Sequence, residues 1–330
     1  MSQLAKAMNI PTEQETTRIS QWIERQVFQE FKRRGGVVGV SGGIDSAVVL
    51  GLSVQALGRN KVIALFMPEK DSSDESETLA EEVADHFGVE LVSTDISPAL
   101  TALGCYDNLT VAIRETFPDY VPNQDKVKLV LPDNLLEKPA LNVFSMALQQ
   151  NGLPEQRKIL SPRSYLGIVA ASNMKQRTRM LTLYFHAEHR NYAVIGTSNK
   201  NEHDQGFFVK YGDGGADLQP IRHLFKSQVY QLAEYLGIPQ SIIQRTPTTD
   251  TYSAGSTQEE FYFRVPFDLL DKIWLGTECG MSALEIADDL CLSEEQVARV
   301  IKDILQKKRT TEYLRTVPLG LDPNSALTPV

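Results

Sequence analysis

The sequence has few cysteines, no long hydrophobic run and no excess of positive charge. Its 330 residues include only Cys105, Cys279 and Cys291, whose wide spacing excludes a disulfide framework and a CxxC zinc or redox pair. No segment reaches the roughly 18 apolar residues that span a bilayer, and the first twenty residues contain no apolar run behind a basic start. We therefore expect a cytoplasmic protein with no signal peptide and no membrane contact.

The net charge of −9 argues against a nucleic-acid partner, because nucleic-acid binding requires a basic face. It leaves room for an anionic ligand, since a local cluster of lysine and arginine can hold phosphates inside an acidic protein. The hydrophobic content of 42% and the charged content of 23% are typical of a folded globular chain. The length allows one large domain or two small ones.

Short apolar segments alternate with helical patterns over much of the chain. The apolar residues of these segments are continuous, which is typical of strands buried on both faces. The expected strands are 37–40, 62–67, 90–95 and 192–196, and the expected helices are 12–34, 46–57, 74–87, 165–190 and 224–236. This order predicts an α/β fold with a doubly wound parallel sheet and flanking helices.

Two further segments do not follow this alternation. Residues from about 99 to 163 contain several prolines and only short apolar pieces, so we interpret them as an insertion or mobile flap rather than a core element. Helical patterns return at 267–275, 282–290 and 293–307, and the last two begin with capping-box spacing at Ser282/Glu285 and Ser293/Gln296. We predict a single domain over 1–330, with a C-terminal helical extension from about 267 to 330.

The segment Ser41-Gly42-Gly43-Ile44-Asp45-Ser46 lies between the first expected strand and a helix. Its glycines allow a tight turn, and the N–H groups at the helix start, with the serine hydroxyls, favour an anion. Open α/β sheets bind ligands at this end of a strand. An acid beside bound phosphates requires a divalent cation between them. The alternative is a tight turn without a ligand; neither a Walker A sequence nor a GxGxxG dinucleotide sequence is present.

Two other segments carry residues suited to anions or metals. In 173–180, on the long expected helix, Arg177 is a candidate anion ligand through its planar guanidinium, unless these basic residues form a solvated face. The polar loop 197–220 follows the strand 192–196 and contains Glu202, a candidate metal carboxylate, and Lys210, a candidate phosphate ligand. The alternative is an ordinary surface loop.

The run SGGIDS is the signature of the PP-loop ATP pyrophosphatases, which split ATP into AMP and pyrophosphate. Together with NMKQRTRM, GTSNKNE and FVKYGDGGADLQP, in this order, it resembles the NAD synthetases over about 36–98 and 167–274. The resemblance implies ATP- and Mg²⁺-dependent amidation of nicotinate adenine dinucleotide (deamido-NAD) to NAD. The carboxylate becomes an adenylate with release of pyrophosphate, and ammonia then displaces AMP. It also implies a homodimer that shares the dinucleotide site.

The resemblance implies roles for individual residues as well. Asp45 and Glu202 are expected to hold Mg²⁺ and, with Lys210, to act in catalysis. Arg177, Lys210 and Asp217 are expected to bind the dinucleotide. The residues expected to bind ATP are Gly39, Val40, Ser41, Gly42, Gly43, Ile44, Asp45, Ser46, Thr197, Lys226 and Thr248.

Three features depart from the family pattern. Short members lack the segment 104–163; residues 258–267 stand where an acidic flap is usual; and Tyr313-Leu314 replaces a His-Lys pair that contacts the dinucleotide. The alternatives are therefore a PP-loop enzyme that amidates a different carboxylate and a protein that only binds nucleotides. The residues before 36 are too few for a glutaminase domain, so we expect free ammonia as the donor, with a separate glutaminase as the alternative. The apolar face of the first helix, with Trp22, Val27 and Phe31, either forms the dimer contact or packs on the domain's own core.

Overall fold

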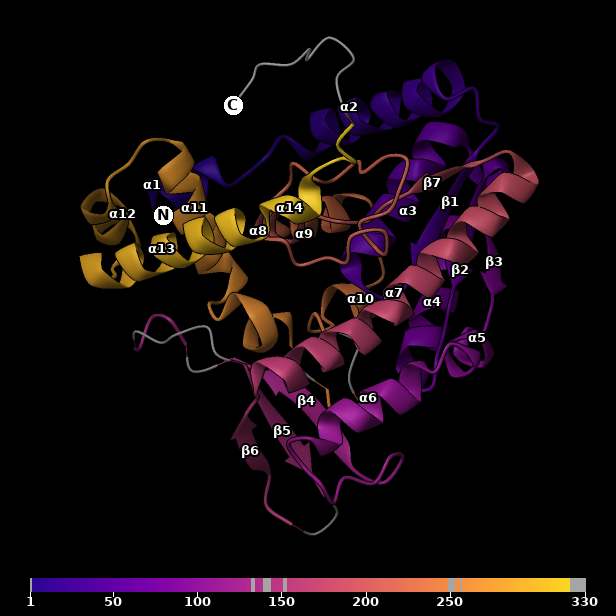
Figure 1. The fold of residues 1–330 in the computed structure, drawn as a ribbon. Helices are drawn as coiled ribbons and strands as arrows, with labels where there is room; N and C mark the ends of the chain where they lie inside the picture. The colour runs from indigo at the N-terminus through magenta and orange to yellow at the C-terminus, as the bar shows by residue number, and fades with distance from the viewer. Residues whose placement is uncertain are drawn as a thin grey trace, which may run out of the picture.

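The protein is built around a four-stranded parallel sheet (Figure 1). The computed structural model describes residues 2–131, 134–138, 144–150, 153–248, 253–255 and 257–320. The strands, in the spatial order β3-β2-β1-β7, are β1 Gly36–Val40, β2 Val62–Phe66, β3 Glu90–Ser93 and β7 Ala193–Ile195. Each pairs in parallel with its neighbour. The predicted parallel α/β sheet is confirmed.

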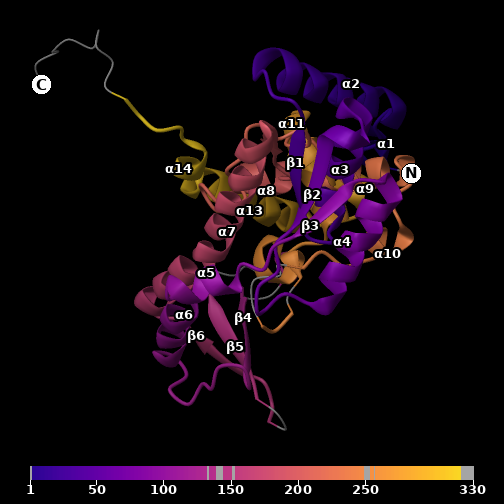
Figure 2. The same cartoon turned by 90° about the vertical axis from the view of Figure 1, so that its right-hand side faces the viewer.

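Helices cover both faces of this sheet, as the apolar strands β1, β2 and β7 require (Figure 2). Val38 and Val40 point into a core shared with α2, α3, α4 and α9, whereas Val37 points to the opposite face, into a core shared with α5 and α7. The first group is α2 Thr12–Glu24, α3 Ile44–Leu57, α4 Asp74–Phe87, α9 Lys226–Tyr235 and the short α10 Gln240–Ile243. The second group is α5 Ser97–Ala102, α6 Cys105–Arg114 and α7 Pro162–Arg190.

The first long helix buries a narrower face than its sequence predicts. It continues from α2 into a π-helical turn, Arg25–Glu30, and ends before residue 34. Residues Ile19, Ile23 and Val27 enter the core, whereas Trp22 and Phe31 are each 40% exposed. Of the two interpretations of this face, packing on the domain's own core therefore holds for Val27.

Residues from about 99 to 163 contain regular structure that the sequence pattern did not predict. After α5 and α6 comes an antiparallel sheet in the order β4-β5-β6, formed by β4 Lys126–Val130, β5 Ser145–Gln149 and β6 Gln156–Ile159. It lies at the lower end of α7 in Figure 1, and its buried side chains form a core with α6 and α7. The prediction that this segment is no core element is wrong for its described part. Its being an insertion or a mobile flap stays a prediction.

The predicted C-terminal helices are present in the described part of the extension, 267–320. It contains α11 Phe267–Glu278, α12 Ala283–Leu290, α13 Glu294–Thr310 and α14 Glu312–Arg315, and the N-terminal α1 Gln3–Ala7 packs against α11 and α12. Both predicted capping boxes are present at the starts of α12 and α13. The short helix α8 Lys200–Gln205 interrupts the segment predicted as a loop. In the part of the chain that the structure describes, no helix has the length and apolar character to cross a membrane.

Candidate active site

The loop of residues 41–43 connects β1 to α3 and turns sharply at Gly42. The φ angle of Gly42 is +70°, and a Cβ there would lie 2.9 Å from the Cβ of Leu79. The Ser46 hydroxyl donates to the Gly43 carbonyl at 2.8 Å and accepts from the Ser41 N–H at 3.4 Å, which closes the loop on the helix. No side chain caps the N-terminus of α3, a helix of 14 residues. Its first N–H groups are therefore suited to an anion.

A cavity of about 140 Å³ opens at this helix N-terminus. Residues from four separate parts of the chain that were predicted to bind ATP or a metal ion line this cavity: Ser41, Gly43, Ile44, Asp45, Ser46, Thr197, Glu202, Lys226 and Thr248. Gly39 and Val40, with Ser41, line an adjoining cavity of about 390 Å³. We call these the smaller and the larger cavity.

Two charged groups of the smaller cavity, Lys226 and Asp45, form an ion pair. The ammonium of Lys226, 1% exposed, donates to Oδ2 of Asp45, and Nδ2 of Asn199 donates to Oδ1 of Asp45 at 2.9 Å. Burial and the nearby Asp45 raise the pKa of Glu202 to about 8. Burial lowers the pKa of Lys226, but Asp45 and Glu202 outweigh this effect and raise it above its ordinary value. The Lys226 ammonium thus pairs with Asp45, and both groups act electrostatically on Glu202.

This donor set fits Mg²⁺. The ion is usually held by one or two carboxylates together with phosphate oxygens and water, and it offsets the repulsion that raises the pKa of Glu202. Among the described residues, no group of three or more His, Cys, Asp or Glu side chains gathers around one point, so a cage made wholly of protein ligands is not present there. A metal held by Asp45 and Glu202 would therefore need further oxygens from a ligand or water.

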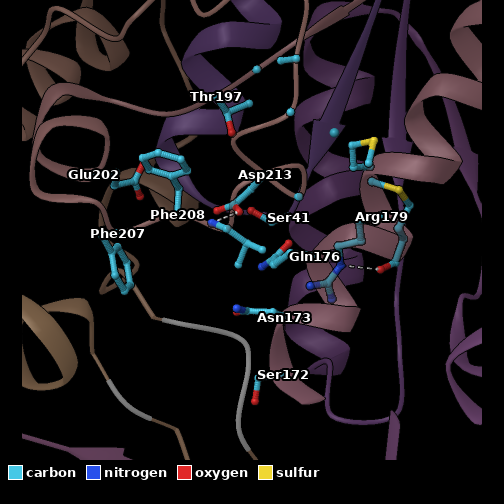
Figure 3. A pocket seen from close by; sticks show the side chains of 18 of the residues that line it. Ser41, Ser172, Asn173, Gln176, Arg179, Thr197, Glu202, Phe207, Phe208 and Asp213 are labelled. Carbon is cyan, nitrogen blue, oxygen red and sulfur yellow. Dashed lines mark hydrogen bonds between the residues drawn. The ribbon is translucent and has the colours of Figure 1, made fainter. Parts of the chain in front are cut away.

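The larger cavity lies between α7, the ends of β1 and β7, and residues 206–216. Figure 3 shows Asn173, Gln176 and Arg179 of α7 along one side of it, with Glu202 and Phe208 across from them. The Arg179 guanidinium donates to the Met67 carbonyl at 3.2 Å.

Arg177, the residue predicted for the substrate, does not line either cavity. It is exposed on another face of α7, and its Nε donates to the Lys210 carbonyl at 3.3 Å. The helical period explains the difference, because positions 176, 179, 180 and 183 share the face that lines the cavity. The role of Arg177 stays a prediction.

Lys210 and Asp217 also lie away from the two cavities. The Lys210 ammonium donates to the carbonyls of Tyr313 at 2.9 Å and Thr316 at 2.7 Å, at the C-terminal turn that follows α13. Asp217 accepts from the Val194 N–H at 2.8 Å and from the Tyr184 hydroxyl at 3.1 Å. The structure thus ties both residues to neighbouring segments, and their roles toward substrate stay predictions.

Sequence reasoning missed Asn199, which connects the two carboxylates. Its side-chain oxygen accepts from the Glu202 N–H at 3.0 Å, and its own N–H donates to Oε2 of Glu202 at 3.2 Å, forming a capping box at the start of α8. Its amide nitrogen reaches Asp45. The signal was present, since Asn-x-x-Glu is capping-box spacing.

The comparisons with known proteins agree with this geometry. A family model described as NAD synthase matches residues 15–115 and 138–318. The NH(3)-dependent NAD(+) synthetase of Rhizobium meliloti (strain 1021) is 47% identical over 319 residues, which cover 97% of this chain and 95% of that protein. The protein of the same name from Thermotoga maritima is 36% identical over 298 residues, covering 90% and 96% of the two chains. The chain belongs to the NAD synthase family.

Two solved structures share the fold. The NMN synthetase of Francisella tularensis has a TM-score of 0.64 at 23% identity, covering 96% of this chain and 100% of that one. The NH3-dependent NAD synthetase of Campylobacter jejuni, in complex with the nitrate ion, has a TM-score of 0.60 at 21% identity, covering 95% and 100%. At these identities the likeness concerns the fold alone.

The NAD synthase match clarifies two of the departures noted in the sequence. It leaves residues 116–137, which include β4, between its two blocks. Its second block includes Tyr313 and Leu314, so the replaced His-Lys pair does not place the chain outside the family. The two named relatives are each matched over nine-tenths or more of their own length.

Proposed function

We propose that this protein is an ammonia-dependent NAD synthetase, a ligase that converts deamido-NAD, ammonia and ATP into NAD, AMP and pyrophosphate. The observation that carries this proposal is the meeting of Asp45, Glu202 and Lys226 with the N-terminus of α3 around one cavity. The names of the Rhizobium and Thermotoga relatives support ammonia and the dinucleotide as substrates. Nothing comparable supports the alternative of a different carboxylate.

In the first step, a carboxylate oxygen of deamido-NAD attacks the α-phosphorus of ATP. The bond from this phosphorus to the bridging oxygen breaks, and its electron pair leaves with pyrophosphate. The N–H groups at the start of α3 and the Lys226 ammonium, which line the smaller cavity, would stabilise charge on the phosphates. Asp45 and Glu202 would hold Mg²⁺, which supplies further positive charge when bound.

In the second step, the lone pair of ammonia attacks the carbon of the mixed anhydride. The bond from this carbon to the AMP oxygen breaks, the electron pair leaves with AMP, and the nitrogen loses a proton. The substrate supplies the nucleophile of the first step, so the protein needs no covalent nucleophile. Its residues position the two anions and offset their repulsion.

We also propose that the exposed face of α7 forms a homodimer contact. Leu181 and Phe185, which follow Arg177 at helical spacing, are 67% and 65% exposed, and Trp22 and Phe31 are the exposed apolar residues of the first helix. Large apolar side chains in a stripe are typical of an interface. A second copy at this face would bring Arg177 to a shared dinucleotide site. Lys210 is proposed to bind the same ligand once its ammonium leaves the carbonyls of Tyr313 and Thr316, and Asp217 is proposed to bind it as well.

The test of the proposed reaction is a product assay by mass spectrometry with ATP, Mg²⁺, deamido-NAD and ¹⁵N-ammonium. We expect NAD labelled at its amide nitrogen together with an equal amount of AMP. AMP formed only with another carboxylate, such as nicotinate mononucleotide, would refute the dinucleotide as substrate. Activity only with glutamine and a cell extract would indicate a separate glutaminase, and absence of AMP under every condition would refute the ligase.

A cytoplasmic location stays a prediction.

A further inference from the structure

A second cation lines the smaller cavity, and neither the sequence motifs nor the family resemblance drew attention to it. Arg245 directly precedes the Thr246-Pro247-Thr248 segment, and all four residues line the cavity. Among the described residues that line this cavity, Lys226 and Arg245 are the cations, and Asp45, Glu202 and Asp213 are the acids. Both cations have an acidic partner: Lys226 pairs with the largely buried Asp45, whereas Nε of Arg245 lies 3.5 Å from the exposed carboxylate of Glu75.

The side chain of Arg245 is held in place against the anion loop. It is 13% exposed; Nη1 donates to the Ser41 carbonyl at 3.3 Å, and Nη2 donates to the hydroxyls of Ser76 at 2.9 Å and Ser73 at 3.4 Å. A Cβ on Gly42 would lie 3.1 Å from Nη1, so the guanidinium lies directly beside the turn of the loop. The serines at the start of α4 thus orient its plane.

The hydrogen-bonding capacity of this guanidinium is not used up by these contacts. An arginine has five N–H donors, two on each terminal nitrogen and one on Nε. Both donors of Nη2 have serine hydroxyls, and Nε is 3.5 Å from a Glu75 carboxylate oxygen. One donor of Nη1 has no acceptor among the described residues, and this nitrogen is the one beside Ser41 and Gly42.

We propose that Arg245 binds the β- and γ-phosphates of ATP and then the pyrophosphate that leaves, with Ser73 and Ser76 orienting it. This inference rests on the proposed function. When the bond between the α-phosphorus and the bridging oxygen breaks, the electron pair moves onto pyrophosphate, and a fixed positive charge beside the loop stabilises it. Arg245 neither gives nor takes a proton in this step.

The experiment measures binding of inorganic pyrophosphate and of AMP by isothermal titration calorimetry, with Mg²⁺ at a fixed concentration. The variants are Arg245→Met, which removes the charge at similar length, and Arg245→Lys, which keeps the charge without the planar fork. Arg309→Met, in the exposed part of α13, is the matched control. AMP is the matched ligand because it lacks the β- and γ-phosphates.

We expect Arg245→Met to weaken pyrophosphate binding by about tenfold or more, as is typical for loss of a charge-assisted hydrogen bond, and to raise the KM for ATP similarly. Arg245→Lys should recover part of the loss, and AMP binding should change less than about twofold. Pyrophosphate binding at the wild-type level in Arg245→Met would overturn the proposal. So would an equal loss of pyrophosphate and AMP binding, which indicates a merely structural role.

The product assay and the pyrophosphate titration together separate this inference from the proposed function. If the wild-type protein forms no AMP with any carboxylate, the proposed reaction fails, but the pyrophosphate titration still decides the role of Arg245. If the wild-type protein forms NAD and Arg245→Met does so with an unchanged KM for ATP, only the inference fails. Should Arg245→Met not fold, Arg245→Lys carries the test, since loss of the fork alone should weaken pyrophosphate binding by severalfold.

Discussion

Replacing Asp271 with alanine tests whether the C-terminal extension holds the ATP side of the site in place. Asp271 lies on α11 and is completely buried. Its carboxylate accepts from Nδ2 of Asn201 at 2.5 Å and from the N–H and hydroxyl of Ser227 at 2.8 and 2.6 Å. Asn201 in turn accepts from the Lys226 N–H at 3.0 Å. One carboxylate therefore ties together the neighbours of Glu202 and Lys226.

The size of the effect follows from these contacts and from the pKa of Asp271. Alanine leaves buried donors without an acceptor, so at pH 7 we expect a loss of about 2 kcal/mol in the free energy of unfolding. Burial raises the pKa of Asp271 from 3.8 to about 6. Because this pKa is raised, the folded wild type binds a proton that the unfolded chain releases between these two values, and its stability falls as pH rises through that window. The cost of D271A should therefore grow by up to about 3 kcal/mol between pH 7 and pH 4.

The assay is urea unfolding of D271A and wild type at several pH values from 4 to 8, with the KM for ATP measured at pH 7. Asp268→Ala on the same helix is the control, since that side chain is 69% exposed and bonds only its neighbour Lys272 among the partners described. We expect D271A to raise the KM for ATP and D268A to leave it unchanged. A loss of stability that is the same at pH 4.5 and pH 7 would refute the assignment of the raised pKa. If D271A had both the stability and the KM for ATP of the wild type, the proposed link between Asp271 and the ATP side of the site would be refuted.

Three further predictions concern the loop, the carboxylates and the segment 99–163. Asp45→Asn and Glu202→Gln should each lower kcat by about 100-fold or more with circular dichroism spectra unchanged, and wild-type rates in both would contradict the metal assignment. Gly42→Ala should lose ATP binding and about 2 kcal/mol or more of stability, because strain at φ +70° adds to a contact of 2.9 Å. Gly237→Ala, with φ +68° and no atom within 4 Å, is the control for a positive φ without the contact. Cleavage by protease within 99–163 should slow when ATP and deamido-NAD are bound, and unchanged cleavage would contradict a lid.

Local chemistry in the sequence determined the parallel sheet and its anion loop. Strands β1, β2 and β7 are short apolar runs separated by helical patterns, so their order alone implies a sheet covered on both sides. The turn at 41–46 could be predicted from the sequence because glycine and serine affect the backbone of their immediate neighbours. The capping boxes before α12 and α13 were predicted for the same reason, since both partners lie within one turn.

Only the tertiary structure decided which distant side chains meet. Arg245, Asn199 and Asp271 reach the site across long separations in the chain, and no local pattern reports such contacts. The period of α7 groups its residues into faces, but packing against the sheet selected Arg179 rather than Arg177 for the cavity. The sheet β4-β5-β6 was not predicted because its strands are short and lie among prolines. Their apolar residues are buried only in the core that they form with α6 and α7, which the local sequence does not show. Backbone preferences act over a few residues, whereas burial and charge pairing act through space, and the site depends on both.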